Sequence, residues 1–110
     1  KKSEWVEFEI KGIYGHMLKE EQIHISRLKN FIFILNSIQD DVDVMEFNPH
    51  SIAASIISIE LNSSVKIYTH SEISKLTDVP EKDISESFLI VRRAWEQSPK
   101  YIPPEFGPQD

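Results

Sequence analysis

The chain has 110 residues, a net charge of −6 and 40% hydrophobic residues, which is typical of one globular domain and too small for two. Because it contains no cysteine, disulfide bonds, a thiol nucleophile and thiolate zinc sites are excluded, and an intracellular protein is expected. The longest apolar run, Phe31 to Leu35, is far too short to span a membrane, and the acidic charge argues against a broadly basic nucleic-acid surface.

The first half of the chain predicts helices. Only three glycines punctuate the whole sequence, which favours an all-α fold over hairpins. The segment from Trp5 to Met17 mixes alternating with helical spacing of its apolar residues; a strand would also fit, and we take it as a helix. A second helix is predicted over 19–38, because Glu20 and Glu21 suit a first turn and apolar residues then recur every three or four positions.

A third helix is predicted over 49–62. Asn48-Pro49 marks its start, since proline suits the first turn of a helix. Its apolar residues lie on nearly all sides, which predicts a central helix surrounded by others. The loop before it is expected to be acidic and solvated, with Asp40, Asp41, Asp43 and Glu46.

Two further helices are marked by their start signals. Thr69 and Glu72 form a capping box, in which each side chain satisfies a free backbone N–H, and this predicts a short helix over 70–77. Pro80 at a first helical position opens a helix over 80–95. The apolar residues of that last helix form one stripe, with Ile84, Phe88, Val91 and Trp95.

The C-terminal end differs from the rest, because prolines recur after Ser98 and forbid further helix. The chain therefore divides into a folded unit, 1–97, and a Pro-rich extended tail, 98–110. Both tryptophans, Trp5 and Trp95, are expected in the core.

The helices 70–77 and 80–95, joined by a short turn, have the size and spacing of a helix-turn-helix, whose second helix enters the DNA major groove. Such a pair is also common as a plain packing unit. Charge argues against DNA here: between Asp78 and Glu86, Lys82 is the only cation among four acids, and acids facing phosphates add repulsion.

The chain shows no motif for a metal site or for catalysis. Its four histidines are not spaced as helical metal-ligand pairs, and the acidic loop lacks the glycine and glutamate spacing of a calcium-binding EF-hand. No phosphate-binding glycine loop or Ser/His/Asp arrangement can be assembled. We therefore expect a protein that is not an enzyme and needs no cofactor.

Two stretches resemble a known family. The run from Pro49 to Ile57 is similar to the central helix of the cyclin fold, which begins with a P-x-x-I-A-A-A-like run. The stretch from Thr69 to Ile84 resembles the T-x-x-E-I-x-x-x-x-G-V-x-x-x-x-I pattern in the second cyclin repeat of the transcription factor IIB family. The tail from Tyr101 to Phe106 is similar to the Pro-rich exit of that repeat.

The resemblance implies a cyclin-like five-helix bundle that ends in a helix-turn-helix. It implies a module of transcription initiation that docks beside TATA-binding protein or the RNA polymerase machinery and faces promoter DNA. The expected location is the nucleus, or the cytoplasm for a homologue from a cytoplasmic virus. The zinc ribbon and first repeat of a full factor do not occur in this sequence, and a start without Met fits one module of a longer chain.

The same resemblance implies which residues would contact DNA. It also implies that departures from the family pattern weaken the recognition of a particular DNA sequence. Asp78 replaces the glycine of the family, and Ser85 stands where the family commonly has a base-contacting arginine. Lys82 replaces a valine and Asp83 a threonine, as in a divergent or viral homologue. We therefore expect the protein to recognise DNA with weak or absent sequence specificity. The candidate DNA-binding residues are Ser71, Lys75, Pro80, Lys82, Asp83, Ser85, Glu86, Arg92 and Arg93.

Two alternatives share the fold. Glu46 to Ala54 also resembles a second cyclin box, which would make the protein a regulator of a cyclin-dependent kinase. A cyclin-fold adaptor that binds neither DNA nor kinase would fit the acidic surface. Co-purification separates these possibilities, because a kinase subunit supports the cyclin and TATA-binding protein or a polymerase supports the transcription factor.

Overall fold

The computed structural model describes residues 1–64 and 66–104, and over these residues the chain is all-helical, as expected. A short 3-10 turn, η1 (Val44–Glu46), precedes the third α-helix. None of the described helices is long and apolar enough to cross a membrane. The five helices are α1 (Lys2–Lys19), α2 (Arg27–Ile38), α3 (Pro49–Leu61), α4 (His70–Thr77) and α5 (Glu81–Gln97).

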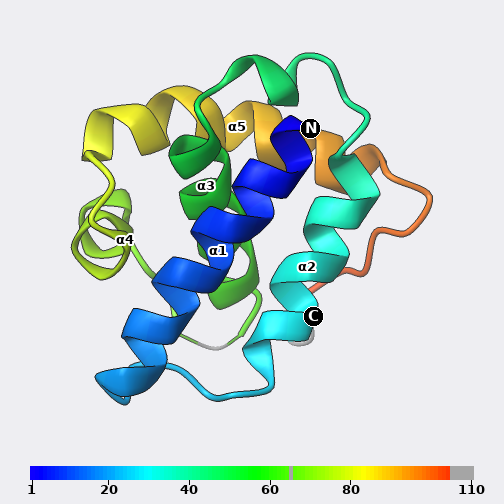
Figure 1. Ribbon diagram of the computed structural model, residues 1–110. Coiled ribbons are helices and arrows are strands. Elements are labelled where there is room, and N and C mark those ends of the chain that lie inside the picture. Colours follow the sequence, from blue (N-terminus) through cyan, green and yellow to red (C-terminus); the bar gives the residue numbers. More distant parts are fainter. Residues whose placement is uncertain (65, 105–110) are drawn as a thin grey trace.

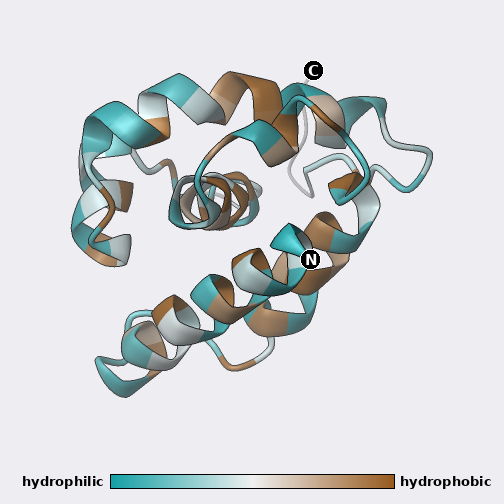
Figure 2. Ribbon diagram, turned by 45° about the horizontal axis from the view of Figure 1, so that its top comes forward, coloured by the Kyte–Doolittle hydropathy of each residue, from teal (hydrophilic) through white to brown (hydrophobic). Residues whose placement is uncertain are grey.

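Helix α3 lies at the centre of the bundle, which confirms the expectation from its composition. Ten of its 13 residues are buried, and Figure 2, in which α3 is seen nearly end-on, shows the other helices around it. It packs against α1, α2, α4 and α5. Ala53 and Ala54 have no exposed surface, and their small side chains let neighbouring helices approach closely.

The predicted helix over 19–38 is wrong in its first third. Helix α1 continues to Lys19, two residues beyond the expected end, and α2 begins only at Arg27. Between them Glu21 has φ of 56°, and the N–H of Gln22 donates to the carbonyl of Met17 at 2.8 Å. This is a Schellman ending, which closes α1 with a left-handed residue. The two acids that suggested a first turn therefore belong to the end of the preceding helix.

The expectation that Trp5 lies in the core is also wrong. Helix α1 buries Val6, Ile10 and Met17 completely, and these residues lie on one face at helical spacing. Trp5 falls outside that face and is 70% exposed, whereas Trp95 is 5% exposed, as expected.

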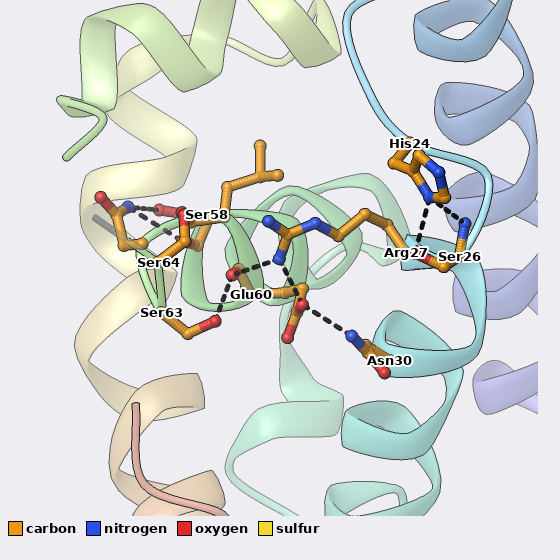
Figure 3. A network of polar contacts seen from close by, with 10 residues as sticks. His24, Ser26, Arg27, Asn30, Ser58, Glu60, Ser63 and Ser64 are labelled. Atoms are coloured by element: carbon orange, nitrogen blue, oxygen red, sulfur yellow. Dashed lines mark hydrogen bonds and ion pairs between the residues drawn. The ribbon is translucent and has the colours of Figure 1, made fainter. Parts of the chain in front are cut away.

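A polar network joins α2 to the end of α3 (Figure 3). Glu60 is nearly buried, and its Oε2 accepts from Arg27 Nη1 at 2.6 Å and from Asn30 Nδ2 at 2.9 Å. Arg27 Nη1 also donates to the Glu60 carbonyl at 3.4 Å. The paired charges satisfy each other at a place where a lone carboxylate would be costly to bury.

The acidic loop, which we expected to be solvated, is held in place by hydrogen bonds within it. Asp41 Oδ1 accepts from the backbone N–H groups of Asp43 and Val44, each at 3.0 Å, and Val44 is fully buried in η1. This side chain satisfies two backbone donors that the short 3-10 turn leaves free.

The segment after α5 has no helix in its described part, 98–104. It is less extended than expected, because the Tyr101 N–H donates to the Ser98 carbonyl at 3.0 Å and makes a turn. That turn brings the Tyr101 ring to 5.4 Å from the Trp95 ring, edge to face. Residues 105–110, including the Glu105 and Phe106 of the family resemblance, lie outside the described residues.

Candidate nucleic-acid interface

Helix α4 begins at the predicted capping box. The Glu72 N–H donates to Thr69 Oγ1 at 3.1 Å, and the Thr69 N–H donates to Glu72 Oε1 at 2.9 Å. The backbone bond from Thr69 is the main reason that the pKa of the exposed Glu72 carboxyl lies below its usual value. The start of α4 is thus determined by two residues within one helical turn.

The turn between α4 and α5 depends on Asp78. Its backbone is left-handed, with φ of 60° and ψ of 28°, and its N–H donates to the Ser74 carbonyl at 2.8 Å. Ser74 Oγ donates to the Val79 carbonyl at 2.6 Å. Glycine is the residue that adopts this backbone most readily, and aspartate is among the more tolerant of the others. Pro80 is the N-cap of α5, so the helix begins at Glu81, one residue later than the sequence suggested.

Buried groups fix α5 against the central helix. Ile84 and Val91 have no exposed surface. Ser87, also fully buried, shares a 2.8 Å hydrogen bond with Ser55 of α3. Because both apolar packing and a buried polar contact hold this face, the opposite face of α5 is the one left for a partner.

Two histidines contact the first turns of α5. His50 Nε2 lies 3.7 Å from Asp83 Oδ2, and His70 Nδ1 lies 3.2 Å from Ser85 Oγ. The His70 ring also packs edge-on against Phe88, with centroids 4.9 Å apart. Asp83 is therefore turned partly toward α3, and Ser85 toward α4.

The exposed start of α5 is acidic. Pro80, Glu81, Lys82 and Glu86 are all exposed, so one lysine faces two glutamates on the part of α5 that a helix-turn-helix presents to bases. These residues lie together at the start of α5, and their net negative charge repels phosphate.

The remaining candidate cations lie apart from that first turn. Arg92 and Arg93 are exposed near the far end of α5, about 15 Å along the helix from Lys82. Arg92 Nε lies 3.8 Å from Glu96 Oε2, and its guanidinium lies 5.5 Å from the Phe88 ring centre. Within the described residues Arg93 makes no ion pair. Ser71 and Lys75 are exposed on α4.

Three residues on or against α5 were not predicted from the sequence. No role for His50 or His70 was expected, because the histidines are not spaced as metal-ligand pairs, and the structure places both against α5. Their contacts cross between helices, so no local pattern signals them. Leu89 is 55% exposed on α5; its position off the buried stripe of that helix was a readable signal.

Compared with family models, with curated proteins and with solved structures, the chain matches none. Its function is therefore inferred from its own residues.

Proposed function

We propose that this chain is a cyclin-like repeat of the transcription factor IIB type, and that α4 and α5 act as a helix-turn-helix facing promoter DNA. In this proposal it is a non-enzymatic module that docks beside TATA-binding protein or a polymerase. The module contacts mainly the sugar-phosphate backbone of the DNA and has little sequence specificity. Ser71, Lys75 and the exposed start of α5 form the DNA-facing surface.

The observation that carries the proposal is the backbone of Asp78. The family pattern has glycine at this position, directly before the valine that matches Val79. Asp78 has φ of 60°, the conformation for which glycine is favoured. This chain thus has, at the position of that glycine, a backbone conformation that glycine favours, although the residue here is aspartate. This agreement concerns a backbone angle, which the sequence alone does not contain.

Electrostatics supports a weak and assisted contact rather than an independent one. The exposed start of α5 carries Glu81 and Glu86 with a single cation, Lys82, so phosphate binding gains little from counterion release. A partner that holds the module at the promoter raises its effective concentration and makes high intrinsic affinity unnecessary. Lys82, Arg92 and Arg93 are the side chains on α5 able to contact phosphates.

The decisive experiment changes only the charge of the proposed DNA face. The double variant Glu81→Gln/Glu86→Gln removes two exposed acids of α5, and its binding to a short fluorescent DNA duplex is measured by anisotropy over a salt series. We expect several-fold tighter binding than for the parent at low salt, and a difference that shrinks as salt screens the repulsion. Asp83 is left intact because it contacts His50.

A matched control separates local from overall charge. Glu20→Gln/Asp40→Asn removes the same charge at exposed positions outside α4 and α5, and it should bind DNA like the parent. If both double variants bound DNA more tightly by the same factor, or neither did, the proposal that the start of α5 faces DNA would be contradicted. Binding of the parent chain to a purified cyclin-dependent kinase, and not to a TATA-binding protein–DNA complex, would favour the cyclin alternative.

A further inference from the structure

A pocket of about 650 Å³ lies between the start of α2, the end of α3 and the segment after α5. Figure 1 shows that segment, coloured orange to red, turning back toward α2. Sites for small molecules usually measure about 300–1,000 Å³ and combine an apolar lining with a few polar groups. This pocket, which we call the α2–α3 pocket, therefore has the size of a small-molecule site.

One part of the α2–α3 pocket is apolar and partly aromatic. Phe33 of α2 and Trp95 of α5 meet edge to face, with ring centroids 6.0 Å apart, and Ile59 and Ile102 also line the pocket. Phe33 is 40% exposed and Ile102 is 62% exposed, so two of the elements that form the pocket leave apolar surface open to water. An apolar ligand body bound against them would remove that surface from water, which favours binding.

The charged groups of the pocket have a surplus of positive charge. Its titratable lining side chains are His24, Arg27, Lys29 and Glu60, so with a neutral histidine there are two cations and one anion. The whole chain, in contrast, has a net charge of −6. Arg27 and Lys29 lie in the first turn of α2, where the helix dipole disfavours cations, and among the described residues no acid lies in that turn. A bound anion would compensate this charge.

Glu60 does not oppose such an anion, because its own charge is already compensated. Figure 3 shows its carboxylate between Arg27 and Asn30, and the Glu60 side chain is only 11% exposed. Both hydrogen bonds of Arg27 to described residues leave from Nη1. Its Nε and Nη2 N–H groups therefore remain unused, and neither is a buried donor without a partner. The planar guanidinium can offer these donors to a carboxylate.

His24 and Lys29 add further donors beside Arg27. The Ser26 N–H donates to His24 Nδ1 at 3.1 Å, so the proton of the neutral imidazole lies on Nε2. That Nε2–H has no acceptor among the described residues. Lys29 is exposed and makes no ion pair with a described residue. Three side chains at the start of α2 thus present N–H donors beside an apolar wall.

We propose that the α2–α3 pocket binds a small organic monocarboxylate. Its flat apolar body lies against Phe33, Trp95 and Ile102, and Arg27 and Lys29 hold its carboxylate. The surplus of one positive charge matches a single negative charge, and the apolar wall favours a ligand with a hydrocarbon body over an inorganic anion. This inference is independent of the proposed function, because none of the candidate DNA-binding residues lines the pocket.

Titration of the full chain with sodium 2-naphthoate, followed by heteronuclear NMR, tests the proposal without DNA. The indole N–H signal of Trp95 should shift because that ring lines the pocket, whereas the signal of Trp5, 70% exposed on α1, should not. The variant Trp5→Phe assigns the two signals. We expect a dissociation constant on the order of 1 mM, as for a small ligand with few contacts.

The neutral 2-naphthamide has the same ring system and no charge, so it separates the two parts of the site. It should bind roughly five-fold more weakly than 2-naphthoate, because it lacks charge-assisted hydrogen bonds. Lys29→Gln should weaken binding of the naphthoate and leave that of the naphthamide unchanged. Ile102→Ala should weaken both by the same factor. Both substitutions fall at exposed positions, and circular dichroism should report an intact fold.

Matched controls change the same residue types outside the pocket. Lys19→Gln removes an exposed lysine, and Val42→Ala removes an apolar side chain that is 76% exposed; both variants should bind the two probes like the parent. A Trp95 signal that stays unmoved up to about 10 mM naphthoate, roughly ten times the expected dissociation constant, would overturn the inference. So would equal affinities of the parent for the two probes, or equal naphthoate affinities of Lys29→Gln and Lys19→Gln.

Discussion

Ser87 of α5 and Ser55 of α3 share a 2.8 Å hydrogen bond between two fully buried hydroxyls. The two groups are not equally dependent on it. Ser87 Oγ also lies 3.0 Å from the Asp83 carbonyl, whereas Ser55 has no other side-chain bond among the described residues. The contact is a fully buried polar link between the proposed DNA-facing helix α5 and the central helix α3.

Replacing each serine should therefore have unequal cost. Ser87→Ala leaves the Ser55 hydroxyl buried without a partner and should lower the free energy of unfolding by about 1–3 kcal/mol. Ser55→Ala leaves Ser87 its bond to Asp83 and should cost less. The double variant should cost less than the sum of the two, and urea unfolding of all four proteins measures this coupling. Additive losses would show that the two hydroxyls do not interact.

Removing one partner of the ion pair between α2 and α3 should lower the free energy of unfolding. Arg27→Met keeps the apolar stem but leaves the nearly buried Glu60 with Asn30 alone, and should destabilise the protein by about 2 kcal/mol in thermal or urea unfolding. Adding Glu60→Met should recover part of the loss, because the uncompensated charge is then gone. If the double variant were the less stable of the two, the pair would not be balanced as the structure implies.

Asp78 should be better replaced by glycine than by alanine. Its φ of 60° strains any residue with a Cβ, so Asp78→Gly should raise the free energy of unfolding by about 0.5 kcal/mol, and Asp78→Ala should lower it by a similar amount. As a control, Asp43→Gly falls at a φ of −69° and should destabilise, because glycine there only adds freedom to the unfolded chain. A loss of stability in Asp78→Gly would contradict the left-handed turn.

The capping box should act locally and depend on pH. Thr69→Ala should cost about 1 kcal/mol and speed amide hydrogen exchange across 70–77. The pKa of Glu72 is lower in the folded protein, so its contribution is present above the usual glutamate pKa and is lost as the pH falls through the lowered value. The stability difference between the parent and Glu72→Gln should therefore shrink in acid. Unchanged exchange over 70–77 in Thr69→Ala would rule out the cap.

Structural features that depend on residues only a few positions apart could be predicted from the sequence. The capping box at Thr69 and Glu72 determined the start of α4, and the apolar residues around α3 determined its central place, because a helix apolar on all sides can be stable only when others cover it. The stripe that ends at Trp95 was correct for the same reason. The left-handed Glu21 was not readable, since glutamate is an ordinary helix residue and only the closing bonds of α1 show that the helix has ended.

Contacts between helices were decided by the tertiary structure alone. His50 meets Asp83 across 33 positions of sequence and His70 meets Ser85 across 15, and no periodic pattern relates residues on different helices. The exposure of Trp5 likewise depends on which face of α1 turns to the core. The composition of α1 permitted more than one such face, and packing against α3 selected the one that buries Val6, Ile10 and Met17. The sequence by itself determined that the chain is all-helical and which helix is central, but it placed the boundary between α1 and α2 wrongly. The packing of the helices decided which side chains remain free to bind.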